Sequence, residues 1–343
     1  MNVITGKTEP LIQAKQTKSG QGIRYPRLFD SMPQFPNKII ITLNRMPQYP
    51  GRFRDLYWLD LETKRTTKIA EVPNIQDEQF GSWLVDHDGI ARGFTTSHDR
   101  NKDYKPNSDK DGLFTYVYLM DPDTQQYSRM TQCRHQEPCF MPLDFDFDNR
   151  FLFGVGQAVL PDGSLDPDWE YTDTNALWLY DTKDKKYVEK VFHDPKFDFS
   201  NPRQGYPDGY ILQDRINKVN FGLSYYAEQR KYVYWDETYG YLRESIQATF
   251  PDDQVGMYAS SDFSKIIITT SSDKSPGSAY FYDPQEGGIV QVAEYAPWLK
   301  DYELGDMIPF DFTSRDGLDL TGYITLPPDY RNCLLYTSDA ADD

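Results

Sequence analysis

The sequence lacks any run of about 18 consecutive apolar residues, the length that a membrane-spanning helix needs, and its first residues form no signal peptide. Basic residues are also outnumbered: 36 Lys and Arg stand against 53 Asp and Glu, which gives a net charge of −17. Because a nucleic-acid backbone needs clustered Lys and Arg, this balance argues against nucleic acid as a partner. We interpret the acidity as a solubilising surface. The compartment, cytoplasmic or periplasmic or secreted, stays unassigned.

Cysteine and histidine, which often ligate metals or act in catalysis, are scarce. The chain has three Cys and four His in 343 residues. Cys133 and Cys139 flank a histidine in CRHQEPC, but no second CxxC accompanies them, and the spacing fits no standard zinc finger. Free thiols and a local disulfide both stay open, and a disulfide would indicate an oxidising compartment. We predict no metal site and no cofactor.

Aromatic residues and turn formers are abundant instead. Aromatics make up 15% of the chain, with 26 Tyr and 20 Phe, beside 22 Gly and 23 Pro. Since Tyr and Phe favour pleated, half-buried strands and Gly and Pro mark turns, we predict an all-β fold. One phrase recurs, as in DLYWLDLETK and YVYLMDPDTQ: an aromatic strand, an aspartate, a polar turn and a second strand. The aligned aspartates, for which we predict a structural role in the turns, are Asp60, Asp121, Asp181, Asp236 and Asp283.

A second phrase, a polar turn that leads into an apolar strand, precedes most copies of the first. Examples are FPNKIIITL and SSDFSKIIITT. DFDFDN (Asp144–Asn149) is a further turn of this kind. It is not a calcium loop, because it lacks the glycine that such a loop has at the sixth position. Short β-units with a period of about 40 to 60 residues are typical of propeller blades, which bury their faces against neighbouring blades. We predict a β-propeller of about six to seven four-stranded blades over residues 1–306, with an incomplete first blade.

The last eleven residues, CLLYTSDAADD (333–343), have no apolar periodicity, no cap and no turn signal. They match, in a single frame, the translation of the transposon adapter used in shotgun DNA sequencing. We interpret them as a non-natural, adapter-derived tail and exclude them from fold reasoning. The alternative is a genuine acidic tail. We expect that the natural reading frame is cut near Asn332 and that the chain begins inside a blade.

Between the repeats and this tail lies FDFTSRDGLDLTGYITLPPDY (Phe310–Tyr330). Asp316 and Gly317 supply the turn of an antiparallel hairpin, and apolar residues alternate on both sides of it. Propeller repeats followed by SRDGLxLxGYxxLP resemble the prolyl oligopeptidase family of serine peptidases, and its acylaminoacyl-peptidase and dipeptidyl-peptidase branch in particular. The resemblance covers essentially all of residues 1–332.

This resemblance implies a function for each part of the chain. Residues 307–332 would be the start of an α/β-hydrolase domain, and the propeller would gate the access of peptide substrates to that domain. The parent protein would be a serine peptidase, and the hydrolase domain would be a partner of the propeller. Peptide specificity is not readable, because the substrate pocket lies mostly in the hydrolase domain.

The catalytic signature of the family is missing from the sequence. No G-x-S-x-G nucleophile elbow occurs. No histidine follows a candidate nucleophile in the order Ser–Asp–His, and we expect surface or turn roles for His87, His98, His135 and His193. We therefore predict no catalytic, cofactor-binding or metal-binding residue in this chain, which should be inactive alone.

Two other classes of function stay open. The chain could be a free-standing β-propeller that binds partners, or a non-peptidase enzyme that uses carboxylates at the propeller's central channel. The SRDGLDLTGYITLPP phrase discriminates against the free-standing module, because such a propeller has no reason to leave its repeat with this hairpin.

Overall fold

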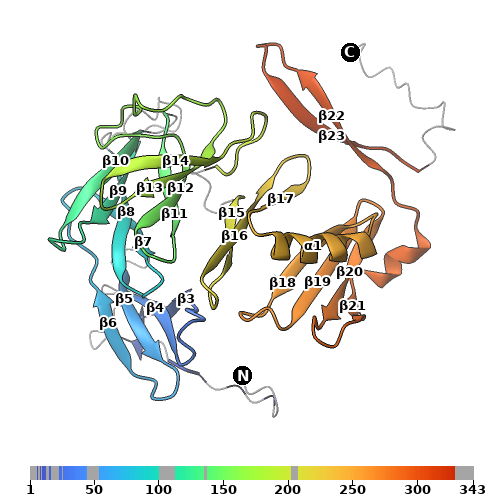
Figure 1. Ribbon diagram of the computed structural model, residues 1–343, viewed down its shortest axis with the longest axis horizontal. Coiled ribbons are helices and arrows are strands. Elements are labelled where there is room, and N and C mark those ends of the chain that lie inside the picture. Colours follow the sequence, from blue (N-terminus) through green and yellow to red (C-terminus); the bar gives the residue numbers. More distant parts are fainter. Residues whose placement is uncertain are drawn as a thin grey trace. The chain divides into compact units, whose positions relative to one another are not determined.

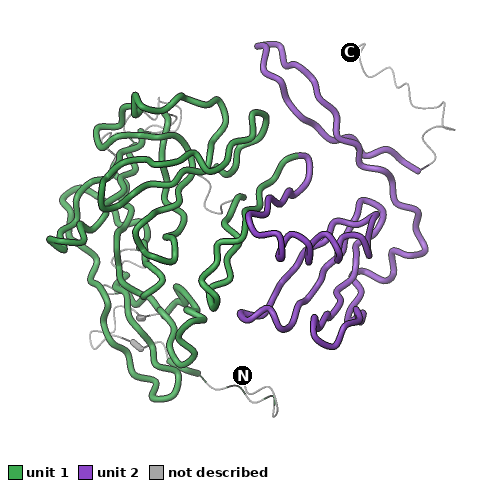
Figure 2. The backbone as a smooth tube through the Cα atoms, in the orientation of Figure 1, with its two compact units in different colours: residues 1–227 green, residues 228–343 purple. Residues whose placement is uncertain are grey.

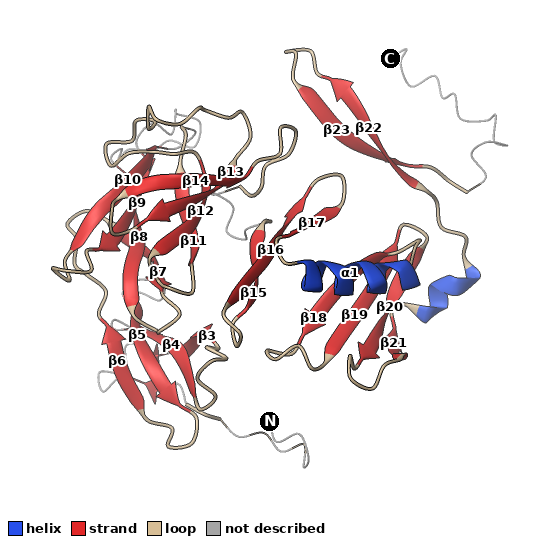
Figure 3. Cartoon of the chain, viewed as in Figure 1, coloured by secondary structure: helices blue, strands red, loops and turns tan. Residues whose placement is uncertain are grey.

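The computed structural model describes residues 6, 8, 10–12, 15–16, 23–24, 26–44, 54–99, 113–134, 137–201 and 208–328. The chain divides into two compact units, residues 1–227 and 228–343 (Figure 2). Strands dominate both units, and the one α-helix among the described residues lies in the second (Figure 3). Within these residues no helix is both long and apolar enough to span a membrane.

Unit 1 contains three four-stranded antiparallel sheets, each formed by consecutive strands (Figure 1). The first sheet is β3 (Pro26–Asp30), β4 (Lys38–Asn44), β5 (Arg54–Asp60) and β6 (Thr66–Ala70). The second is β7 (Gln79–Val85), β8 (Ala91–Asp99), β9 (Leu113–Met120) and β10 (Tyr127–Arg134). The third is β11 (Phe140–Phe145), β12 (Phe151–Gly156), β13 (Ala176–Asp181) and β14 (Lys186–Phe192). Short β1 (Lys15–Gln16) and β2 (Ile23–Arg24) precede them, and the hairpin of β15 (Tyr210–Asp214) and β16 (Val219–Tyr226) follows.

Unit 2 begins with β17 (Arg230–Tyr234) and helix α1 (Glu237–Thr249). A fourth four-stranded sheet follows, made of β18 (Gln254–Ala259), β19 (Ile266–Ser272), β20 (Ser275–Tyr282) and β21 (Ile289–Glu294). A 3₁₀ turn, η1 (Pro297–Asp301), leads to the hairpin of β22 (Met307–Thr313) and β23 (Asp319–Thr325). Helix α1 buries Ile246 against Val255, Ile266 and Ile268 of the sheet.

The cores of unit 1 lie between successive sheets. Second strands such as β4 (KIIITLN) and β12 (FLFGVG) are nearly continuous apolar runs, as expected of strands covered on both faces. The core between the first and second sheets includes Met32, Ile40, Leu56, Trp83 and Phe94. The core between the second and third includes Val117, Met130, Phe140, Leu152 and Trp178. Four-stranded meanders that bury their faces against one another are the blades of a β-propeller, which confirms the predicted fold class.

Four of the five aligned aspartates occupy equivalent turns. Asp60 and Asp181 end the third strand of a sheet, Asp121 and Asp283 directly follow one, and all four precede the fourth strand. In each turn one carboxylate oxygen accepts hydrogen bonds from the backbone N–H groups two and three residues further on, at 2.7 to 3.4 Å. This local bonding explains why an aspartate recurs at this place in the repeat.

The prediction of the same turn at Asp236 is wrong. Asp236 is the N-cap of α1, and its carboxylate accepts from the N–H groups of Thr238 and Tyr239. The next residues continue as a helix instead of a fourth strand. The reason is tertiary, because Leu242, Ile246 and Phe250 recur at helical spacing and all pack on the apolar face of the neighbouring sheet.

The predicted hairpins at two other places are confirmed. DFDFDN lies at the end of β11 and in its turn to β12, where the Asp146 carboxylate accepts from the backbone of Phe151 at 2.7 Å. The SRDG turn joins β22 and β23, and Gly317 has a φ of 87°, which glycine adopts without strain.

The domain boundary at 306/307 stays a prediction. The predicted tail, residues 333–343, lies outside the described residues, as does most of the segment expected to form the incomplete first blade.

Candidate functional site

The first hairpin turns of the sheets in unit 1 carry a group of linked charged and polar side chains. These turns join β3 to β4, β7 to β8, β11 to β12 and β15 to β16. We call five side chains at or beside these turns the turn cluster: Asp30, Gln34, His87, Asp144 and Arg215. They come from four different hairpins, yet bonds and charge interactions link them into one group.

An ion pair joins the hairpin β15–β16 to the first sheet. Arg215 Nη1 donates to Asp30 Oδ1 at 2.8 Å, and the two residues are 185 positions apart. Arg215 Nη2 also lies 3.4 Å from the sulfur of Met32. Asp30 is held in place by its own turn, since its carboxylate accepts from the Met32 N–H at 2.7 Å. Side chains of the pair are 22% and 26% exposed, so water reaches both.

His87, in the β7–β8 turn, is only 5% exposed. Its Nε2 lies 2.9 Å from the carbonyl oxygen of Phe145. Because a carbonyl only accepts, Nε2 carries the proton of this hydrogen bond. The ring stacks on Phe147 with centroids 4.2 Å apart, and the backbone of His87 accepts from Gln34 Nε2 at 2.7 Å. Of the surface or turn roles expected for this histidine, the turn role is the one found, and Phe147 of a neighbouring turn covers its ring.

Asp144, near the end of β11, is the electrostatically unfavourable member of the cluster. Its Oδ1 lies 3.9 Å from His87 Nε2, and its side chain is 35% exposed. Burial is the largest influence and raises the pKa of this carboxyl above its ordinary value of 3.8, although the charges of His87 and Arg215 act in the opposite direction. The ionised carboxylate is therefore less stable here than it is in the unfolded chain.

Asp144→Asn should consequently stabilise the protein at neutral pH, by about 0.5 to 1 kcal/mol after allowance for solvent screening. A raised folded-state pKa means that the folded protein binds the Asp144 proton more tightly than the unfolded chain does. The gain should therefore be present at pH 7 and vanish as the pH falls below about 4. Urea unfolding at both pH values measures it. Asp148→Asn, on the exposed part of the same turn, is the control, and an equal gain there would contradict the argument.

The geometry of the cluster suits holding turns together more than acyl transfer. That chemistry needs a nucleophile with an adjacent base, and donors for the developing oxyanion. Among the described residues, no serine, threonine or cysteine side chain is hydrogen-bonded to His87. His193 Nε2 instead lies 2.9 Å from the Thr174 hydroxyl oxygen, beyond β14, and His98 lies on β8. His135 is outside the described residues.

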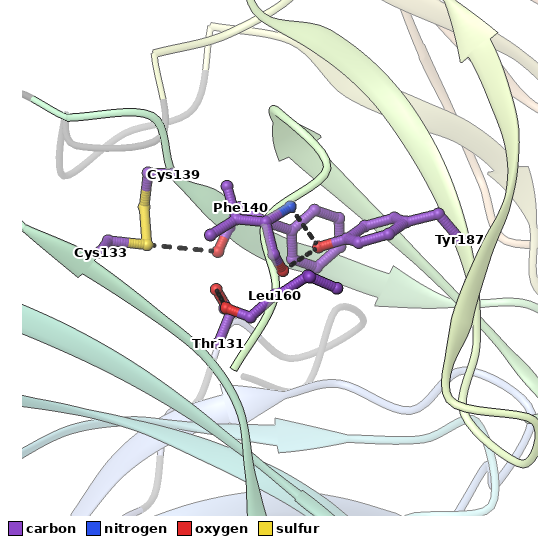
Figure 4. Close-up of a disulfide and its surroundings, with 7 residues drawn as sticks. Thr131, Cys133, Cys139, Phe140, Leu160 and Tyr187 are labelled. Atoms are coloured by element: carbon purple, nitrogen blue, oxygen red, sulfur yellow. Dashed lines mark hydrogen bonds between the residues drawn. A yellow bond between two sulfur atoms is a disulfide. The ribbon is translucent and has the colours of Figure 1, made fainter. Parts of the chain in front are cut away.

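Cys133 and Cys139 form a disulfide between the end of β10 and the start of β11 (Figure 4). Both residues are nearly fully buried, and the sulfur of Cys133 lies 3.7 Å from the carbonyl oxygen of Phe140. Of the two states left open by the sequence, the disulfide is therefore the one found. The bond closes the connection between the second and third sheets. The described residues hold no group of three or more His, Cys, Asp or Glu side chains placed to bind a metal ion.

Comparison with known proteins adds a relative. No protein-family model matches the chain. A curated protein, dipeptidyl peptidase family member 6 of Caenorhabditis elegans, is 23% identical over 189 residues, which cover 55% of this chain and 23% of that protein. It carries the name of the peptidase branch that the blade repeats and the SRDGLDLTGYITLP hairpin resemble. The chain spans about a quarter of the length of this relative.

The chain also matches solved structures, each at low identity. Puromycin hydrolase is 12% identical with a TM-score of 0.46, and the match covers 94% of this chain and 45% of that one. Prolyl oligopeptidase B from Galerina marginata is 11% identical with a TM-score of 0.36, covering 90% and 47%. An oligogalacturonate lyase from Vibrio parahaemolyticus is 11% identical with a TM-score of 0.38, covering 93% and 97%.

The turn cluster was not found from the sequence. The turn phrase DFDFDN contains Asp144, and a surface or turn role was expected for His87. Nothing in them shows which turns meet, because the partners lie up to 185 residues apart. The alternation of polar turns and buried strands was the available signal, and it indicates only that each turn lies at a strand end.

Proposed function

We propose that this chain is the propeller portion of a serine peptidase of the prolyl oligopeptidase family, and that it gates peptide substrates on their way to an α/β-hydrolase domain. The chain supplies no catalytic triad of its own. The observation that carries the proposal is the hairpin β22–β23, which follows the last four-stranded sheet and forms a separate two-stranded sheet. The same hairpin carries the family-like phrase SRDGLDLTGYITLP.

The hairpin has one apolar and one largely polar face. Its register places Ile308 opposite Ile324, and Phe312 opposite Leu320. Phe310 completes this side, which we call the hairpin apolar face. All five side chains are 41% to 45% exposed. The other face is more polar and includes the Thr321–Asp311 hydrogen bond of 2.8 Å.

An apolar sheet face of this kind is a surface for another sheet or domain. In the proposal its partner is the hydrolase domain, whose sheet would continue from this hairpin. A free-standing propeller gives the hairpin no such partner. The proposal therefore accounts for both the family-like phrase and the exposed apolar face.

Replacing Phe312 by serine should remove the centre of the hairpin apolar face without touching a blade. We expect the variant to bind less of the dye ANS and to self-associate less than the unchanged chain, because exposed apolar area drives both. ANS fluorescence and sedimentation velocity measure this. Thr321→Ser, on the other face, should behave like the unchanged chain. Equal dye binding by Phe312→Ser and the unchanged chain would mean that the hairpin is not the exposed docking face.

A further inference from the structure

The hydrogen bonds of the turn cluster follow a definite order through unit 1. The Arg215 side chain binds Asp30 of the first sheet. Gln34, in the turn that follows Asp30, donates to the backbone of His87 in the second sheet. The ring of His87 then binds the Phe145 carbonyl of the third sheet. The backbone N–H of His87 also donates to the Asn149 side chain at 3.0 Å. The four hairpins are thereby connected through their turns.

One of these connections differs from the others. Gln34 to His87 and His87 to Phe145 join sheets that are neighbours along the chain, which also share apolar cores. Arg215 to Asp30 joins the last hairpin of unit 1 to its first sheet and passes over two sheets in sequence. The first strands β7 and β11 contact each other, so the first strands of successive blades face the inside of the propeller. A bond between β3 and the β15–β16 turn therefore spans the inner side.

We infer that the Arg215–Asp30 ion pair is a latch across the inner ends of the blades, which holds the first and last hairpins of unit 1 together and can open. A peptide that moves along the inner strands would have to pass this latch. This role as the moving part of the gate rests on the proposed function. The latch itself rests only on the contacts of the described residues.

The chemistry of the pair allows it to open. The two side chains are 22% and 26% exposed, so the pair stays in contact with water and is weakened by salt. Asp30 stays fixed by its bond to the Met32 N–H when Arg215 leaves. A fully buried pair would instead leave an uncompensated charge and would be costly to separate. The ion pair therefore connects the two turns and can still separate.

Hydrogen exchange followed by mass spectrometry on the whole chain tests the latch. In Arg215→Met we expect amides to exchange about fivefold faster in both residues 31–37 and residues 215–218. Asp30→Asn, which keeps an oxygen for the Met32 N–H, should speed exchange in 215–218. About 1 M salt should produce the same change in the unchanged chain but not in Arg215→Met.

Lys185→Met is the matched control, because Lys185 Nζ binds Asp121 Oδ2 at the same 2.8 Å but joins adjacent sheets. We expect it to leave residues 31–37 and 215–218 unchanged. Unchanged exchange in residues 31–37 of Arg215→Met would overturn the latch. Hydrolysis of peptides by the chain would overturn the proposed function and would leave these exchange results standing, so the two failures are distinguishable.

Discussion

The chain of 343 residues should hydrolyse no peptide or ester substrate above the rate in buffer, which places it at least about 10⁶-fold below an active peptidase. Acyl transfer needs an activated nucleophile, a base within hydrogen-bond reach and an oxyanion hole. The sequence contains no G-x-S-x-G elbow. The buried His87 is bonded to a backbone carbonyl and not to a nucleophile. Binding of a peptide without differential stabilisation of the transition state gives no rate enhancement.

Chromogenic aminoacyl, acyl-aminoacyl and Gly-Pro substrates measure this turnover, and a fluorophosphonate probe reports any activated serine. We expect no turnover and no stoichiometric labelling. His87→Ala should give the same negative result, so any activity that survives this substitution comes from a contaminant or from another residue. Turnover that depends on His87, or labelling of one serine, would contradict the proposed function and would place a catalytic site in the propeller.

Trp178→Ala should destabilise unit 1 by about 3 to 5 kcal/mol, the range for removing a large, fully buried aromatic side chain. Trp178 is 0% exposed and lies in the core between the second and third sheets. Its ring packs edge-on against Trp169 and Tyr187, with centroids 5.2 and 5.9 Å away. Its Nε1 donates to the Gly156 carbonyl at 2.9 Å, so the substitution also leaves a buried acceptor without its donor.

Urea unfolding followed by circular dichroism measures the loss as a lower midpoint. Trp178→Phe keeps most of the apolar contact and loses the hydrogen bond, so we expect a smaller cost of about 1 to 2 kcal/mol. Tyr171→Ala, at a side chain 53% exposed, should change stability by less than about 0.5 kcal/mol. If Trp178→Ala cost no more than Tyr171→Ala, the two sheets would not depend on this core.

Much of the blade architecture was predictable because its causes are local. An aspartate such as Asp121 bonds the backbone of its own turn, so its place in the repeat is visible in the sequence. Apolar runs such as KIIIT predict covered strands, and Asp316-Gly317 predicts a hairpin. The same local reasoning placed Asp236 in a strand turn, where the structure has the N-cap of a helix.

The tertiary structure decided the features that depend on how separate strands, sheets and turns meet. The segment after Asp236 is a helix because Ile246 finds an apolar sheet face to cover. The disulfide forms because the ends of β10 and β11 bring Cys133 and Cys139 to a Cα separation of 4.9 Å. The turn cluster exists because Arg215 meets Asp30 across 185 residues. Local propensity and spacing contain no information on such meetings, since packing of whole blades brings these turns together.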